Sequence, residues 1–296
     1  MSGAAATIAA RPTRRLRHPI LALLAQAGRL GRTRIGLALV LLVMAVALIG
    51  PLLAPHSPTA FVAPPFAPPS AAAAFGTDNL GRDVLSRFLS GGLSILGLSL
   101  AATVIGLGAG IAVGLTAAYA RGATDEVLMR LMDVLLAFPQ IVFVLLLVAG
   151  LGPQLWLIVL TVGLTHMPRV ARVARGAALE VVGRDFVRAA EALGETRARI
   201  LAAEVLPNMS SPLLVEFGLR LTYSIGLIAA VSFLGFGLQP PAADWGLMIN
   251  ENRIGITLQP WAVVLPVTAI GLLTVGMNLI TDGIARAAIG LGRGTA

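Results

Sequence analysis

The side chains that could carry a chemical reaction are few in this chain of 296 residues. There is no cysteine, which excludes disulfides, cysteine-ligated zinc and thiol nucleophiles. All 22 basic residues are arginine, so the lysine that a phosphate-binding P-loop or a Schiff base needs is missing. The three histidines (His18, His56 and His166) lie too far apart in the sequence to suggest a metal site. We therefore expect no catalytic residue, metal or cofactor in this chain.

Acidic residues inside apolar segments are the next candidates, because a charge in a membrane helix is functional by default. We expect Asp133 to pair with a nearby arginine such as Arg130, or to cap an adjacent helix. Spacings of four residues predict the pairs Asp83–Arg87, Glu216–Arg220 and Asp282–Arg286. The intramembrane acids lie near the ends of apolar segments, which argues against a proton relay. His166 also lies near such an end without an evident catalytic companion, which argues against an intramembrane serine protease.

A charged, alanine-rich stretch at 185–207 stands out from its apolar surroundings. Its first part predicts a short helix with one face formed by Phe186, Ala189, Ala190 and Leu193. Gly194 is a natural stop, because glycine tolerates the left-handed cap conformation. Thr196 then caps a second helix, and Pro207 interrupts the chain before the next apolar segment. The small residues allow close approach to another protein, so we weigh docking into a groove of a partner against a surface-lying connector.

The surrounding chain has the composition of a membrane protein, with 57% hydrophobic and 12% charged residues and a mean hydropathy of +0.88. Segments of about 20 apolar residues can cross a bilayer as helices. Six candidates follow, the third and fourth meeting in a tight turn at 150–153; they lie at 35–54, 93–119, 133–150, 154–171, 212–236 and 261–284. Gly106, Gly110 and Gly114 predict close helix packing, within this chain or against a second subunit.

Arginine positions orient these spans, because cytoplasmic flanks are enriched in basic residues. With six spans, 19 of the 22 arginines fall on one side, and only Arg82, Arg87 and Arg253 fall on the other. Both termini and the 185–207 stretch are therefore predicted to be cytoplasmic. The outer connection at 55–91 starts as an irregular Pro- and Ala-rich segment. We expect it to end in an amphipathic helix, which either lies on the membrane or contacts an external partner.

Several motifs in this framework resemble the inner-membrane permease subunits of bacterial ABC importers, of the second (C-type) kind in dipeptide, oligopeptide and nickel systems. That family's cytoplasmic loop reads EAA, three residues, Gly, nine residues and I-x-L-P. Here Arg188-Ala189-Ala190, Gly194 and Glu204-x-Leu206-Pro207 match its spacing, with Arg188 and Glu204 replacing the usual Glu and Ile. Further similar stretches lie at 76–87, 129–140, 231–253 and 260–288; the Asp-Pro with which the family usually continues after the last is missing.

The resemblance implies an all-α membrane protein with six transmembrane helices and a coupling helix between the fourth and fifth. The coupling surface would comprise Phe186, Arg188, Ala189, Ala190, Glu191, Ala192, Leu193, Gly194 and Glu195, with Leu206 and Pro207 at the end of the loop. The expected parts are a cytoplasmic N-terminal segment (1–34), a first span with its external loop (35–92), the permease domain (93–288) and a cytoplasmic tail (289–296).

The implied function is that of a permease subunit in an ATP-driven peptide importer of the bacterial inner membrane. Its expected partners are a homologous second permease, two cytoplasmic ABC ATPases that bind ATP and Mg, an external substrate-binding protein and the lipid bilayer, but no nucleic acid. The alternative is a secondary transporter driven by an ion gradient, which would need charged groups near mid-membrane or paired broken helices. The residues of the substrate path and the identity of the cargo stay open.

Overall fold

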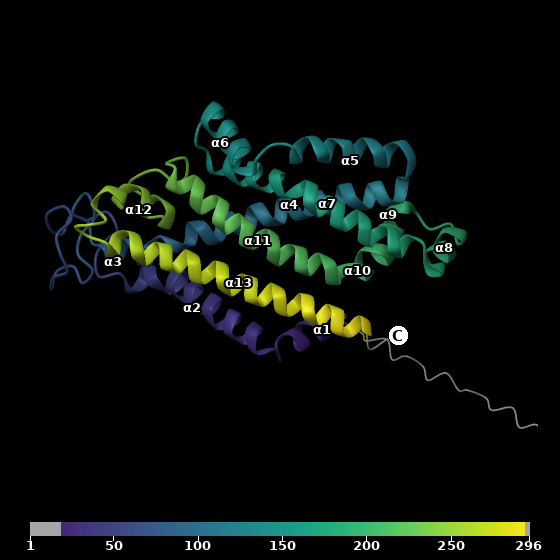
Figure 1. The fold of residues 1–296 in the computed structure, drawn as a ribbon, viewed down its shortest axis with the longest axis horizontal. Helices are drawn as coiled ribbons and strands as arrows, with labels where there is room; N and C mark the ends of the chain where they lie inside the picture. The colour runs from purple at the N-terminus through teal and green to yellow at the C-terminus, as the bar shows by residue number, and fades with distance from the viewer. Residues whose placement is uncertain (1–18, 294–296) are drawn as a thin grey trace, which may run out of the picture.

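A computed structural model describes residues 19–293. Most of the predicted cytoplasmic N-terminal segment, with the arginines at 11–17, and the last residues of the predicted C-terminal tail lie outside the described residues. Within them the chain is helical, with only two isolated β-bridges, Phe61 with Arg82 and Thr77 with Asp83. Long helices run roughly side by side along one axis of the molecule, with the short elements gathered at its two ends (Figure 1).

Five helices are long and apolar enough to cross a membrane, and the count becomes six if a bent pair forms one span. They correspond to five of the predicted spans, and the fourth extends about ten residues beyond its predicted end. The long helices are α2 (Gly31–Leu53), α4 (Gly92–Ala120, preceded by α3, Val84–Ser90), α7 (Leu155–Val182), α11 (Ser210–Phe233) and α13 (Trp261–Arg293). The short α1 (Pro19–Ala27) packs against α13.

The predicted third span at 133–150 is not a continuous helix. It is divided between α5 (Gly122–Leu136) and α6 (Gln140–Leu151), whose axes differ by 81°. The cause is local, because Pro139 disfavours helical backbone at Phe138 and cannot donate a hydrogen bond. The predicted turn between the third and fourth spans is confirmed, since Gly152 adopts a positive φ of 92° between α6 and α7.

The three glycines of α4 pack against α7 inside this chain, which settles the alternative of a seam with a second subunit. A Cβ atom at Gly106 would lie 2.5 Å from the carbonyl oxygen of Gly163, and one at Gly114 would lie 2.5 Å from that of Ala171. Larger residues would separate the two helices, so the four-residue glycine spacing sets their close approach.

Of the four predicted ion pairs, only Glu216–Arg220 forms; two of the others find partners on a neighbouring long helix. Asp133 pairs with Arg172 of α7 at 2.5 Å, not with Arg130, because α5 lies alongside α7. Asp282 pairs with Arg32 of α2 at 3.5 Å and not with Arg286. Glu216 and Arg220 do pair within α11, at 2.8 Å, and both are buried. Spacing within one helix cannot reveal a closer partner on its neighbour.

Candidate functional site

The charged stretch forms a compact elbow at one end of the bundle, between the end of α7 and the start of α11 (Figure 1). It contains α8 (Asp185–Ala192), α9 (Arg197–Arg199), a π-helical turn (Ile200–Val205) and α10 (Leu206–Asn208). We call residues 185–208 the α8 elbow. The described ends of the chain, at α1 and α13, lie at this same end of the molecule, whereas α3 and α12 (Trp245–Asn252) lie at the other (Figure 1).

The predicted stop at Gly194 is confirmed in detail. Gly194 adopts a φ of 78°, and its N–H donates to the Glu191 carbonyl at 3.0 Å. The N–H of Glu195 donates to the Ala190 carbonyl at 3.2 Å, which completes a Schellman motif. A Cβ atom at Gly194 would meet no atom within 4 Å, so the requirement for glycine is conformational and not steric.

The predicted face of α8 is open to its surroundings. Phe186 is 37% exposed and Leu193 is 84% exposed, although both are large apolar side chains beside arginines. Together with Ala189 and Ala190 they form one wall of a groove of about 340 Å³, and the π-helical turn with Glu204 forms the other. The elbow therefore presents an apolar groove with charged edges, which suits contact with another protein.

Val187 anchors this open helix, although the sequence did not single it out. Its side chain is fully buried in a cluster with Ala178, Val182 and Ile200, which joins α8 to α7 and to the π-helical turn. Its partners follow from tertiary packing, and the only signal in the sequence is a valine on the face of α8 opposite Ala189. The elbow is therefore held in place without burying its predicted contact face.

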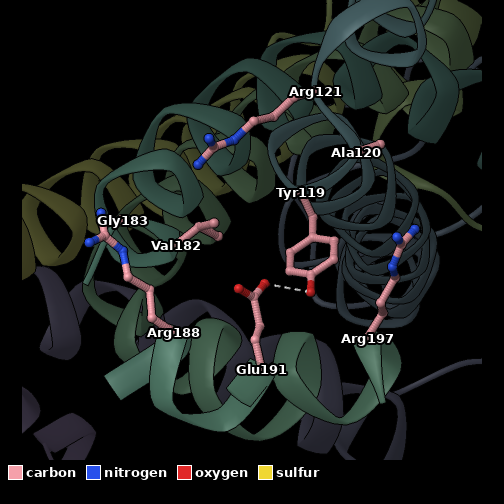
Figure 2. A pocket seen from close by; sticks show the side chains of 8 residues that line it. All are labelled: Tyr119, Ala120, Arg121, Val182, Gly183, Arg188, Glu191 and Arg197. Atoms are coloured by element: carbon pink, nitrogen blue, oxygen red, sulfur yellow. Dashed lines mark hydrogen bonds between the residues drawn. The ribbon is translucent and has the colours of Figure 1, made fainter. Parts of the chain in front are cut away.

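A second contact connects α8 to the end of α4. The Tyr119 hydroxyl donates to the Glu191 carboxylate at 2.8 Å, and the Arg197 guanidinium lies 5.8 Å from the Tyr119 ring centre. Figure 2 shows Glu191 and Tyr119 meeting between Arg121, Arg188 and Arg197. All five side chains line an open cavity of about 380 Å³. Tyr119 and Arg197 were not predicted as part of the site, because 72 residues separate Tyr119 from Glu191.

The second half of the elbow departs from a regular helix. Thr196 caps it as predicted, its hydroxyl accepting from the Arg199 N–H at 3.4 Å. The chain then widens into the π-helical turn; Pro207 lies in the first turn of α10, and the helix is interrupted two residues later, at Met209. Leu206 packs against the Val187 cluster, whereas Pro207 is exposed. Ala189 and Ala190 from the start of the family-like motif and Glu204 from its end therefore line the same groove.

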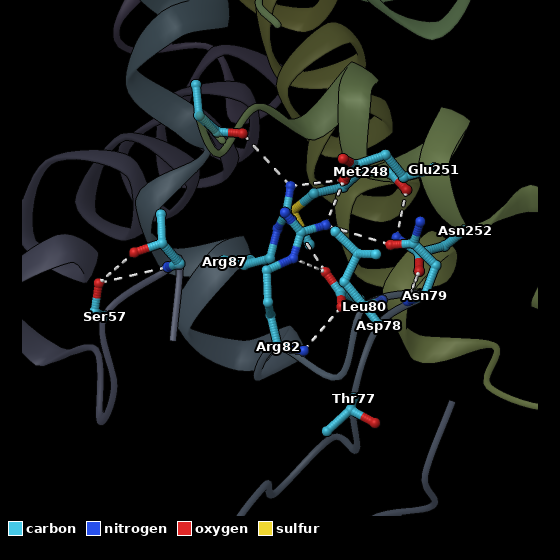
Figure 3. A network of polar contacts seen from close by, with 12 residues as sticks. Ser57, Thr77, Asp78, Asn79, Leu80, Arg82, Arg87, Met248, Glu251 and Asn252 are labelled. Carbon is cyan, nitrogen blue, oxygen red and sulfur yellow. Dashed lines mark hydrogen bonds and ion pairs between the residues drawn. The ribbon is translucent and has the colours of Figure 1, made fainter. Parts of the chain in front are cut away.

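The opposite end of the molecule holds charges that are buried. Arg87 lies 3.0 Å from Asp78 and 2.7 Å from Glu251, and Arg82 lies 2.7 Å from Asp78 and 3.1 Å from Glu251. Figure 3 shows these four side chains meeting between α3, the preceding loop and α12; we call them the cap cluster. Burial raises the pKa of the Glu251 carboxyl above its usual range, and Arg82 opposes that shift.

The cap cluster corrects two predictions for the outer connection. Arg87 pairs with Asp78 and Glu251, not with Asp83, whose carboxylate instead caps α3 by accepting from the Ser86 N–H at 2.9 Å. The amphipathic helix predicted at the end of this connection is short, since it begins only at Val84 and ends at Ser90. The cap cluster joins residues 78–87 to α12, more than 150 residues away along the chain.

One buried histidine also has a partner that the sequence did not reveal. His166 Nε2 lies 2.9 Å from the Ser224 hydroxyl, which lies 2.9 Å from that of Thr103. These three residues join α7, α11 and α4. Within the described residues the other ring nitrogen has no hydrogen-bond partner, so no carboxylate orients the ring as a catalytic triad requires. The contact is a packing element, and no metal-binding group of acidic or histidine residues occurs in 19–293.

The comparisons with known proteins agree with this arrangement. Residues 110–288 match the family described as binding-protein-dependent transport system inner membrane component. The chain is 37% identical over 252 residues to a putative peptide transport system permease protein of Brucella suis, covering 85% of each chain. It is 36% identical to the di/tripeptide transport system permease protein DppC of Pseudomonas aeruginosa, covering 84% of each.

A further relative is the probable D,D-dipeptide transport system permease protein DdpC of Escherichia coli, 35% identical with 83% of each chain covered. The fold resembles a chain of the methionine ABC transporter MetNI, solved in inward-facing conformations. That match has a TM-score of 0.50 at 20% identity and covers 68% of this chain and 96% of the other.

These findings decide between the two transport mechanisms considered from the sequence. The ion-gradient-driven alternative is wrong, because the family and the curated relatives are ABC permeases. The chain belongs to the binding-protein-dependent transport system inner membrane components, and it is a multi-pass permease subunit of an ABC importer in the cytoplasmic membrane.

Proposed function

We propose that this permease forms half of the translocation path of a peptide importer, with a homologous permease as the other half. Its α8 elbow docks onto a cytoplasmic ATPase subunit. The observation that carries the docking is the exposed groove of Phe186, Ala189, Ala190 and Leu193 on a helix that Val187 anchors from behind. A helix that is anchored on one side and exposes an apolar face on the other suits contact with an ATPase subunit that moves it.

The proposed orientation in the membrane rests on the end of the molecule that holds the α8 elbow. The α8 elbow, α1 and the described end of α13 lie together (Figure 1), and the arginine positions in the sequence favour a cytoplasmic location for the elbow and both termini. ATP and Mg bind to two partner ATPases, since this chain lacks the lysine of a P-loop. An external binding protein delivers the cargo, and the names of the relatives favour peptides.

Substitution of Gly194 tests the docking role. Valine at a positive φ is strained by about 1–2 kcal/mol, which would disturb the Schellman turn and the placement of Leu193. We expect Gly194→Val to lower ATP-driven uptake about tenfold, since 1.4 kcal/mol corresponds to a factor of ten. ATP hydrolysis by the assembled complex and the amount of permease in the membrane should change far less.

Two controls isolate the cause. Gly194→Asn keeps a residue that tolerates the left-handed region, and we expect uptake near that of the unaltered transporter. Gly176→Val makes the same change in α7, where a Cβ atom also meets nothing within 4 Å but φ is not positive. Unchanged uptake in Gly194→Val would contradict the docking role.

A further inference from the structure

Three arginines on successive turns of α7 have different surroundings. Arg175 donates two hydrogen bonds to Asp125, at 2.5 and 2.6 Å, and Arg172 lies 2.5 Å from Asp133. Both acids belong to α5. Arg169 comes one turn earlier, and no carboxylate in residues 19–293 lies within ion-pair distance of it. Helix α5 ends at Leu136, so it supplies no acidic residue at the level of Arg169.

Arg169 instead lines a cavity of about 250 Å³ at the break between α5 and α6. The polar corner of this cavity consists of Arg169, Gln140 and Thr165, and the Gln140 amide donates to the Thr165 carbonyl at 3.2 Å. The rings of Phe138 and Phe143 contribute an apolar wall, with their centres 6.1 Å apart. We call this the break cavity.

The membrane makes this combination unusual. Irregular backbone at membrane depth is tolerated only where it is buried in protein or lines a water-filled space. A charged side chain within a membrane-spanning segment is costly, and it marks a path for ligands by default. The arginine count from the sequence placed Arg169 on the cytoplasmic side, but it is the 15th of the 28 residues of α7, and its side chain is exposed in this subunit. Both features meet at the break cavity, which therefore combines interrupted backbone with a cationic side chain within the span.

The net charge around Arg169 is positive. The nearest carboxylate on α11, Glu216, is already paired with Arg220, and His166 beside them is buried in its hydrogen bond to Ser224. A guanidinium with no internal anion attracts a carboxylate from outside, because the two planar groups form paired hydrogen bonds. The aromatic wall beside it fits an apolar side chain.

We infer that the break cavity holds the cargo in transit, with Arg169 binding its carboxylate and Gln140 adding an amide contact. This inference rests on the proposed function, and it names the class of cargo: a small molecule with a free carboxylate and an adjoining apolar group, such as the C-terminal end of a peptide. Asp125 and Asp133 keep the neighbouring arginines occupied, so the charge of Arg169 alone is offered to the ligand.

Thiol labelling in the assembled transporter tests this inference, because this chain has no cysteine of its own. Phe138→Cys places a reporter in the wall of the break cavity. An anionic methanethiosulfonate should modify it faster than a cationic one. Adding Arg169→Gln should lower that ratio of rates about tenfold, which corresponds to about 1.4 kcal/mol, because the positive charge beside the thiol is removed. Arg130→Gln, on an exposed arginine of α5 outside the cavity, is the matched control.

Ligand protection completes the test. Dialanine should slow labelling at position 138, dialanine amide should not, and Arg169→Gln should abolish the difference. Absent labelling, a ratio that Arg169→Gln leaves unchanged, or equal protection by the amide would each overturn the inference. If the glutamine variant does not assemble, Arg169→Lys must keep the preference for the anionic reagent, and its loss would also overturn the inference. ATP-driven uptake of dialanine by the unaltered transporter is measured separately and tests the peptide cargo of the proposed function alone.

Discussion

The two ends of this permease treat charge in opposite ways. In the cap cluster, Arg87 is fully buried and pairs with Asp78 and Glu251 within the same subunit. In the α8 elbow, Arg188 and Glu195 are exposed beside apolar side chains that are also exposed. Buried, internally paired charges fix one arrangement of the chain, whereas exposed charges around an apolar groove are available to a partner. The cap cluster therefore stabilises one end of the fold, whereas the α8 elbow offers a surface to a partner protein.

The largest effect is expected from breaking the cap cluster. Arg87→Ala leaves Asp78 and Glu251 as buried carboxylates with half of their partners, which costs about 3–5 kcal/mol in comparable buried pairs. We expect a lower unfolding temperature of the purified subunit and faster proteolysis near α3 and α12. Arg253→Ala, an exposed arginine near the same end, should change neither; equal loss in both variants would contradict a special role of the cluster.

A smaller effect is expected behind the α8 groove. Val187→Ala removes two buried carbon atoms and should weaken the local stability of the elbow by about 2 kcal/mol. Amide hydrogen exchange in α8 reports that change directly. Leu193→Ala, on the exposed face, should leave exchange unaltered and weaken binding of the ATPase subunits instead. If Leu193→Ala also accelerated exchange, its side chain would be part of the fold and not of a contact surface.

The smallest effect is expected at the exposed contact between α8 and α4. Tyr119→Phe removes the hydrogen bond to Glu191 and should cost less than about 1 kcal/mol, because water replaces most of it. Glu191→Gln added to Tyr119→Phe should have little further effect on exchange in α8, which a double-mutant cycle measures. Tyr223→Phe is the matched control; its hydroxyl forms no hydrogen bond within the described residues.

Much of the fold followed from local signals. Apolar length located the spans, and Gly194 and Thr196 marked the ends of the elbow helices, because caps depend on residues adjacent in sequence. The Pro139 break was visible in the sequence, but hydropathy across it was high enough to suggest one continuous span. Local patterns therefore predicted which segments are helical better than where a helix is interrupted.

Partners distant in sequence escaped prediction for a different reason. Arg87 with Glu251, Tyr119 with Glu191 and Asp133 with Arg172 depend on how helices are placed side by side. Each has an alternative partner at helical spacing that is reasonable in isolation. Of the elbow, the sequence predicted the exposed face and its glycine stop, whereas the anchor Val187 required the packing of α7 against the π-helical turn.

The glycine contacts between α4 and α7 have a mechanical consequence. Helices in backbone contact at Gly106 and Gly114 cannot slide past one another without steric collision, so they behave as one stiff lever. The α8 elbow continues from one member of that lever and touches the other through Tyr119. A push on the elbow would thus be transmitted to both helices together, and the flexible joint must lie elsewhere, with the bend at Pro139 as the nearest interruption.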